Sequence, residues 1–215
     1  DGATLSKRHG PVSVLQYQEA GYLPDALLNY LVRLGWSHGD QEVFTRAEMI
    51  AAFDIRDVNK AASAFNGEKL LWLNQQHMIK APLALLAAVL REQLARLGVA
   101  CDDQALLEGV ANAQRERCKT LKEMAQKSLY FFRDFEAFDD KAASKHLNAQ
   151  SLPLLDQLSA GLRELGDWNA AGVHGVIAAV AERAGAGLGK VAQPLRVAMS
   201  GGTVSPPIDL TVALV

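Results

Sequence analysis

Cysteine is scarce in this sequence, and long hydrophobic runs are missing. Cys101 and Cys118 are the only cysteines among 215 residues, too few for a disulfide framework, so we expect reduced thiols in a cytoplasmic protein. No apolar run reaches the roughly 18 residues of a membrane span, and no secretory signal peptide is visible. These absences argue against a secreted protein and against a membrane partner.

The spacings typical of metal and catalytic sites are also missing. The cysteines lie 17 positions apart and the histidines form no i, i+4 pair, so we expect no metal site. The neighbours Asp139 and Asp140 cannot face each other on a helix, and they are interpreted as a helix cap. Neither a dinucleotide-binding glycine fingerprint nor a phosphate-loop motif occurs. A Cys/His nucleophilic pair stays open, although no residue context supports it.

Signals for the start and end of helices are abundant instead. Residues 24–35 begin at Pro24 and end at Gly35, as proline-started and glycine-stopped helices do, and Thr45 and Glu48 have capping-box spacing. No alternating strand pattern of useful length occurs, so we predict an all-α fold with short connections. Further helical patterns cover residues 67–78, 81–98, 103–118, 120–132, 139–148, 151–165 and 168–184, and the closing DLTVALV is expected to begin another helix.

Charge is nearly balanced overall, but one segment is basic. The net charge of −2 gives no general attraction to nucleic acid, so any polyanion must be bound locally. Residues 113–133 carry a local excess of four positive charges over Glu116 and Glu123. This segment is either a solvated helix face with ordinary charge pairs or a phosphate-binding track. The aromatic residues Tyr130, Phe131 and Phe132 fall within it, as core residues or, less favoured, as base-stacking groups.

The opening DGATLSKRHG is the only other candidate for chemistry. Its cluster of Lys7, Arg8 and His9 lies between Gly2 and Gly10, where a flexible backbone can approach an anion. The alternative is a solvated terminus that happens to be basic. Because the chain starts without methionine and stops in an apolar stretch, we expect it to be a fragment of a longer protein.

Five segments together resemble one family. LSKRHG resembles the KMSKS loop of class I aminoacyl-tRNA synthetases, in the form found in bacterial glutamyl-tRNA synthetases. Four further segments resemble stretches of the same family and occur in the same order as in that family. They are HGPVSVLQYQEAGYLPDALLNYLVRLGWSHGDQEVFTRAEMI, FDIRDVNKAASAFNGEKLLWLNQQHM, RCKTLKEMAQKSLYFF and GKVAQPLRVAMSGGTVSPPI. These segments span nearly the whole chain, which makes the match close and specific.

The resemblance implies an organisation and an activity. Residues 1–80 would form the KMSKS loop and a helical stem-contact region, and residues 81–150 and 151–215 two helical sub-bundles of an anticodon-binding domain. The full enzyme would activate glutamate with ATP and Mg²⁺ and attach it to tRNA(Glu), with no DNA partner. The glutamate pocket and the other ATP motif lie upstream in the family, so this chain alone is predicted to be inactive and to bind no cofactor.

The resemblance also assigns residues to the ATP site. Lys7 matches the lysine that contacts the phosphates of ATP and the leaving pyrophosphate, and a mobile loop can bring such a charge to the reacting groups. Ser6 would shape the turn, and Arg8 would belong to the same ATP-binding motif. The sequence departs from the family pattern at Thr4, where a first lysine is usual, and at Pro11, where a small residue is common.

Contacts with tRNA are implied further along the chain. Arg117 matches the position where discriminating members carry an arginine, so it is predicted to distinguish the third anticodon base of glutamate tRNA, C, from the G of glutamine tRNA. The alternatives are a contact with a phosphate or a neighbouring glutamate, and Arg115 is close enough to exchange roles with Arg117. On composition alone, GGTVSPPI is a plain interhelical turn. The complete predicted set of tRNA contacts is Arg117, Lys119, Lys122, Arg196, Ser205, Pro206 and Ile208.

One other kind of protein stays open, and two relatives are disfavoured. The alternative is a free-standing helical module that binds tRNA or protein without catalysis. A glutaminyl enzyme is disfavoured because its anticodon domain is a β-barrel. A short tRNA-modifying paralogue is disfavoured because it lacks the helical C-terminal half that is present here.

Overall fold

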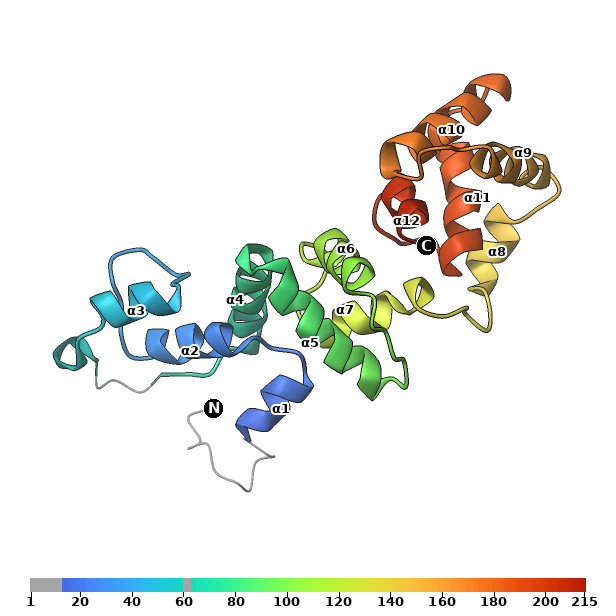
Figure 1. Ribbon diagram of the computed structural model, residues 1–215. Helices are drawn as coiled ribbons and strands as arrows, with labels where there is room; N and C mark the ends of the chain where they lie inside the picture. The colour runs from blue at the N-terminus through green and yellow to red at the C-terminus, as the bar shows by residue number, and fades with distance from the viewer. Residues whose placement is uncertain (1–12, 60–62) are drawn as a thin grey trace. The chain divides into compact units, whose positions relative to one another are not determined.

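The computed structural model describes residues 13–59 and 63–215, and these residues are helical with no β-strand among them (Figure 1). This confirms the all-α prediction. Ser6, Lys7 and Arg8 lie outside the described residues. Contacts divide the chain into two compact units, Asp1–Lys127 and Ser128–Val215. The domain boundaries expected after residues 80 and 150 stay predictions.

Seven α-helices and one 3₁₀ helix form the described part of the first unit. Thr45 and Glu48 make the predicted capping box, and the side chains of Asn66 and Asp103 cap two further helices by accepting backbone N–H groups. The helices are α1 (Val14–Glu19), α2 (Pro24–Arg33), α3 (Arg46–Ala52), η1 (Ile55–Asp57), α4 (Gly67–Lys80), α5 (Leu83–Arg96), α6 (Gln104–Gln114) and α7 (Leu121–Lys127).

Three apolar contact regions hold these helices together. Tyr30 of α2 packs with Leu70 and Leu73 of α4, while Trp36, Phe44 and Met49 gather beside α3. Helix α5 packs against α6 and α7 with the fully buried Leu86, Leu90 and Leu94. Burial of one such side chain contributes about 1.5–3 kcal/mol, so the helices that carry the basic segment are anchored to a well-packed core.

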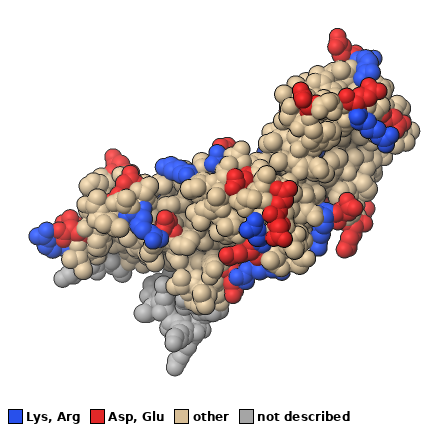
Figure 2. Space-filling model, viewed as in Figure 1, with Lys and Arg blue, Asp and Glu red and all other residues tan. Residues whose placement is uncertain are grey.

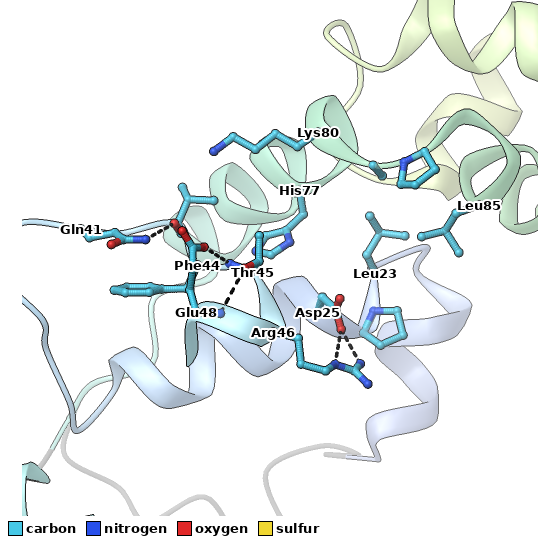
Figure 3. Close-up of a pocket in the computed structure, with 14 residues that line it drawn as sticks. Leu23, Asp25, Gln41, Phe44, Thr45, Arg46, Glu48, His77, Lys80 and Leu85 are labelled. Atoms are coloured by element: carbon cyan, nitrogen blue, oxygen red, sulfur yellow. Dashed lines mark hydrogen bonds and ion pairs between the residues drawn. The ribbon is translucent and has the colours of Figure 1, made fainter. Parts of the chain in front are cut away.

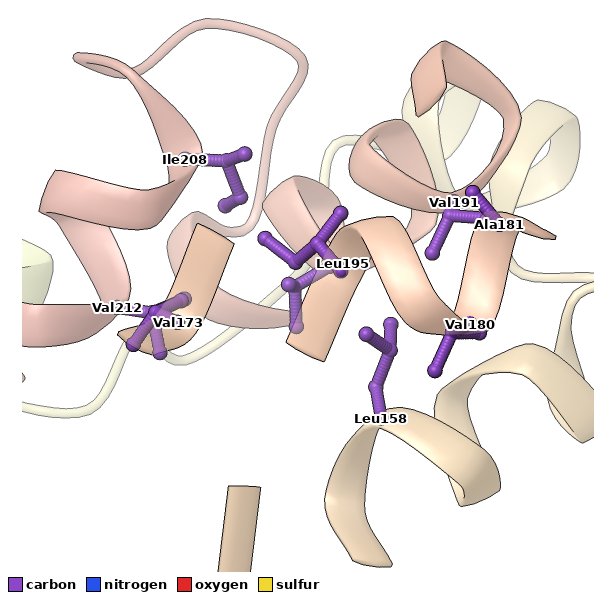
Figure 4. Close-up of a cluster of buried hydrophobic side chains, with 9 residues drawn as sticks. Leu158, Val173, Val180, Ala181, Val191, Leu195, Ile208 and Val212 are labelled. Carbon is purple, nitrogen blue, oxygen red and sulfur yellow. The ribbon is translucent and has the colours of Figure 1, made fainter. Parts of the chain in front are cut away.

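The second unit is built around α10. This helix packs against α9, α11 and α12, and its Val173 and Ile177 share a core with Leu158, Leu195 and Val212 from those three helices (Figure 4). The bounds are η2 (Leu129–Phe131), α8 (Asp140–His146), α9 (Leu152–Arg163), α10 (Ala170–Arg183), α11 (Leu188–Ser200) and α12 (Ile208–Leu214).

Several elements differ from the sequence expectations. The helix expected over 103–118 ends at Gln114, and the short η1 was not predicted. The helix expected over 120–132 ends at Lys127, because Ser128 leaves helical geometry at φ −109° and ψ 6° before η2 begins. Helices α1 and α11 were not predicted. Short α1 is capped by Ser13, and α11 contains the buried Pro194 in its interior, a residue that normally interrupts a helix.

None of the described helices is long and apolar enough to cross a membrane.

Candidate nucleic-acid interface

Residues 115–120 connect α6 to α7, and together with Leu121 and Lys122, the first two residues of α7, they are called the basic turn below. It begins where the N–H groups of Arg117 and Cys118 donate to the carbonyl oxygen of Gln114, at 2.8 and 3.1 Å. The side chains of Arg117, Lys119 and Lys122 are exposed. The three cations predicted from this segment to contact tRNA therefore lie within one short surface turn.

The positive charges near this turn are not equally available. Lys127 Nζ lies 2.6 Å from Glu123 Oε1, whereas Lys119 Nζ makes only a 3.9 Å ion pair with Glu68 and its side chain is about half exposed, at 51%. Arg117 and Lys122 make no side-chain hydrogen bond or ion pair within the described ranges. The interpretation of this segment as a solvated helix face with ordinary charge pairs therefore fits Lys127. The cations of the basic turn, by contrast, are available to bind a polyanion.

Glu123 organises the start of α7. Its carboxylate accepts the N–H of Lys119 at 2.7 Å, and its own N–H donates to Thr120 Oγ1 at 3.1 Å. Burial alone would raise the pKa of Glu123, but the hydrogen bonds from Lys127 and Lys119 outweigh it and lower that pKa. The carboxylate is thus held in its charged form as part of the turn.

The backbone of the basic turn is fixed by α4 and by the loop before α2. The side chain of Asn74 donates to the Lys119 carbonyl oxygen at 2.6 Å, and the Leu121 N–H donates to the Gly21 carbonyl oxygen at 2.9 Å. Gly21 has φ +80°, and a Cβ at this position would lie 2.3 Å from the backbone nitrogen of Lys122. Only glycine therefore allows this approach.

Cys118 lies inside the turn, where burial disfavours the reactive thiolate form of its side chain. Its side chain is fully buried, and this burial raises the pKa of the thiol to about 11. A thiol that stays protonated at neutral pH is a weak nucleophile. The structure therefore gives no support to a Cys118-based Cys/His pair.

The aromatic residues after α7 are packed rather than open. Phe131 is only 6% exposed, and its ring centroid lies 4.3 Å from that of Tyr130. Phe132 is partly buried. This arrangement favours the core reading over base stacking.

In the second unit, Arg196 and the loop 201–208 are joined by a small polar network. Arg196 Nε donates to Ser205 Oγ at 2.9 Å, and Ser205 Oγ donates to the Pro206 carbonyl oxygen at 2.7 Å. Thr211 Oγ1 lies 3.3 Å from both of these acceptor atoms. The structure thus brings Arg196, Ser205 and Pro206 together, and their contact with tRNA stays a prediction.

Most side chains predicted at this loop face inward. Ser205 is 8% exposed and Ile208 is 9% exposed and part of the α10–α12 core, and Pro206 is also buried. The exposed residues of the loop are Thr203, Val204 and Pro207. Sequence reasoning missed these three, because nothing in the composition of GGTVSPPI separates inward from outward positions.

A pocket in the first unit lies apart from the basic turn. It has a volume of about 560 Å³ and is lined from α2, α3, α4 and α5, with no residue from 115–122 (Figure 3). Arg46 Nε donates to Asp25 at 3.1 Å, and His77 Nε2 lies 3.0 Å from Asn29 Oδ1. Burial lowers the pKa of His77. The polar groups of the pocket are largely hydrogen-bonded or ion-paired with one another, and they form no catalytic arrangement.

Charged residues of both signs are mixed on the surface. On the face shown in Figure 2, Lys and Arg side chains lie beside Asp and Glu side chains in each unit. Within the parts of the chain that the structure describes, no group of three or more His, Cys, Asp or Glu side chains could hold a metal ion. Any attraction to nucleic acid therefore depends on local features such as the basic turn.

Comparison with protein families decides the assignment. A family described as "Anticodon binding domain" matches residues 72–215, more than half of the chain. The chain belongs to this anticodon-binding domain family. Residues 1–72, ahead of the anticodon-binding domain, match "tRNA synthetases class I (E and Q), catalytic domain".

Individual relatives agree with this result. The chain is 54% identical over its full length to proteins named "Glutamate--tRNA ligase 1" from Alkalilimnicola ehrlichii and from Nitrosococcus oceani. It spans only 45% and 46% of those relatives. These matches confirm the resemblance to glutamyl-tRNA synthetases, and the anticodon-binding domain forms the larger part of the matched region.

A solved structure extends the comparison to the fold. A crystal structure of a glutamate tRNA ligase from Elizabethkingia meningosepticum, in complex with its amino acid, superposes with a TM-score of 0.85 at 29% identity. The match covers all of this chain and 46% of that one. The helical fold of this chain is therefore shared with the matching part of that glutamate tRNA ligase.

Proposed function

We propose that this chain is the tRNA-binding part of a glutamate–tRNA ligase. The observation that carries the proposal is its 54% identity, over its whole length, to proteins named as glutamate–tRNA ligases. The complete enzyme activates glutamate with ATP and esterifies tRNA(Glu), and this part binds the stem and the anticodon. The same proposal places the protein in the cytoplasm with its tRNA.

ATP chemistry belongs to the KMSKS-like segment. The ammonium group of Lys7 would stabilise the negative charge that develops on the phosphates during adenylate formation, with Ser6 and Arg8 in the same loop. Mg²⁺ would neutralise the phosphates as part of the ATP substrate.

Recognition of tRNA is assigned to two groups of residues, one in each unit. Lys119 and Lys122 would contact phosphates, which positions a nucleic acid without reading its sequence. Arg117 is exposed, and its planar guanidinium would read the third anticodon base. Arg196 and the loop built around Ser205, Pro206 and Ile208 would support another part of the anticodon through the exposed loop backbone.

Binding of tRNA at increasing salt concentration tests the phosphate contacts. Each phosphate contact on a single strand contributes a slope of roughly −0.7 to log K against log salt, and on a duplex about −0.9. Changing both Lys119 and Lys122 to alanine should therefore weaken the binding of all tRNAs alike. It should also reduce the slope of log K against log salt by the contribution of roughly two phosphate contacts. Lys80→Ala, an exposed cation outside the basic turn, is the matched control and should leave the slope unchanged. Affinity of the unaltered chain that does not depend on salt would refute the phosphate assignment.

A further inference from the structure

Two neighbouring amide side chains on α4 hold the backbone on both sides of Arg117. Gln75 Nε2 donates to the carbonyl oxygen of Glu116 at 2.8 Å, and Asn74 Nδ2 donates to that of Lys119 at 2.6 Å. These two carbonyl groups bracket Arg117 and Cys118. The backbone that carries the Arg117 side chain is therefore tied to α4, a helix about 40 positions earlier in the sequence.

Asn74 reaches a second segment with the other end of its amide. Its Oδ1 accepts the N–H of Leu23, the residue before α2, at 2.8 Å, and the side chain is fully buried. Reversing the amide would place its NH₂ against the Leu23 N–H and its oxygen against the Lys119 carbonyl, so its orientation is determined by its partners. One buried side chain thus links the start of α2 to the basic turn.

The buried Cys118 side chain completes the attachment. It is fully enclosed, and the Leu121 N–H bonds to Gly21 next to the same α2 entry. The residues on either side of Arg117 are fixed by these contacts, while Arg117 itself is exposed. A shift of the Lys119 carbonyl would therefore move the base of the Arg117 side chain.

We propose that Asn74 is a positioning residue for anticodon discrimination, which fixes the basic turn to the start of α2 and so sets where Arg117 meets the base. This inference rests on the proposed function, in which Arg117 reads the third anticodon base. Asn74 does not touch the tRNA. It acts through the Lys119 carbonyl and the turn.

A purely structural role makes a different prediction. Buried amides are usually hydrogen-bonded for stability alone, and their loss then lowers the thermal midpoint and the amount of active enzyme without changing the choice between tRNAs. A positioning role changes that choice. It also affects KM for tRNA more than kcat, because the chemistry takes place elsewhere in the enzyme.

The experiment uses full-length ligase carrying this chain, with Asn74→Asp, Arg117→Gln and the double variant. Asn74→Asp keeps the acceptor for the Leu23 N–H and replaces the donor to Lys119 with an oxygen. We expect KM for glutamate tRNA to rise roughly tenfold with kcat within about twofold, and the preference over glutamine tRNA to fall roughly tenfold. The double variant should discriminate no worse than Arg117→Gln alone, because both changes remove the same contact.

Two further variants keep the test decisive. Gln76→Ala alters the next amide along α4, which makes no side-chain hydrogen bond to any described residue, and it should match the unaltered enzyme. Gln75→Ala removes the contact with the Glu116 carbonyl and should repeat the loss of discrimination in weaker form. It replaces Asn74→Asp as the test if that variant does not fold.

The outcomes separate this inference from the proposed function. Unaltered enzyme that fails to charge glutamate tRNA overturns both. If the unaltered enzyme charges it and Arg117→Gln loses discrimination while Asn74→Asp keeps it, the positioning role alone is overturned. The positioning role would also be overturned if the double variant lost tRNA discrimination by the product of the two single-variant losses. That result would show that Asn74 and Arg117 act independently.

Discussion

Arg117 is exposed, and the backbone on both sides of it is constrained. The flanking carbonyl groups of Glu116 and Lys119 are held by α4, so little backbone freedom is lost when the side chain meets a ligand. Reduced ordering cost on binding is a general source of affinity and selectivity. A long arginine side chain on a fixed turn is therefore well suited to reading one base, the role proposed for Arg117.

Cys118 and Cys101 should differ sharply in reactivity. Cys118 is fully buried with a thiol pKa of about 11, whereas Cys101 is partly exposed. Iodoacetamide at pH 8 should therefore modify only Cys101 in the native chain, as measured by peptide mass spectrometry, and both thiols after denaturation. Because the folded-state pKa of Cys118 is raised, its contribution to stability is present below pH 9 and is lost as the pH rises toward 11. Rapid native modification of Cys118 would show that the basic turn opens readily.

Ser205 should matter for the stability of the second unit. Its hydroxyl accepts from Arg196 and donates to the Pro206 carbonyl oxygen while 8% exposed. Ser205→Ala should lower the free energy of unfolding by about 1–2 kcal/mol, measured by urea denaturation, because buried groups lose their partners. Thr203→Ala, in the exposed part of the loop, should change it by less than about 0.5 kcal/mol. Equal effects at the two positions would argue against the buried network.

At the scale of elements, the approach of the α1–α2 loop to α7 depends on Gly21. An added Cβ would lie 2.3 Å from Lys122 N, at a residue with φ +80°. Gly21→Ala should therefore lower the free energy of unfolding by at least about 2 kcal/mol, from the close contact and the strained backbone together. Thermal or urea unfolding of the purified chain measures this loss.

Gly39 provides the matched control for this substitution. It also has a positive φ, +55°, but a Cβ there would meet nothing within 4 Å. Gly39→Ala should therefore cost only the backbone strain, about 1 kcal/mol. If the two variants lost equal stability, the close contact between the Gly21 loop and α7 would be ruled out.

The sequence predicted the helices whose ends carry local signals. Pro24 begins α2 and the Thr45–Glu48 pair caps α3, as expected, because these effects act over one helical turn. Helix α11 was missed because Pro194 opposes the helix locally, while its burial in the second unit favours it. Packing across distant segments decided that element, and a local pattern does not report it.

The same limit applies to the candidate site. The cations of the basic turn were visible in the sequence because solvent exposure of a charged segment is a simple pattern. The burial of Ile208 and the hydrogen bonds of Asn74 were not, because they depend on segments far away in the chain. The roles of Arg117 and Arg196 came from the family resemblance and stay proposals.

At the scale of the whole molecule, local positive charge has to attract tRNA although the net charge of the chain is slightly negative. The net charge is −2, and charges of both signs are mixed on the surface shown in Figure 2. Binding to tRNA should therefore rely on a few placed contacts and be easily weakened by salt. In the proposed function, the contact between Arg117 and an anticodon base would supply the specificity.

The most direct test of tRNA recognition uses a single base change. The 215-residue chain is titrated with a glutamate tRNA transcript and with the same transcript carrying G as its third anticodon base, at one low salt concentration. We expect the altered transcript to bind more weakly by about 1–3 kcal/mol, and we expect Arg117→Gln to remove that difference. Equal affinity of the unaltered chain for both transcripts would contradict anticodon reading by Arg117.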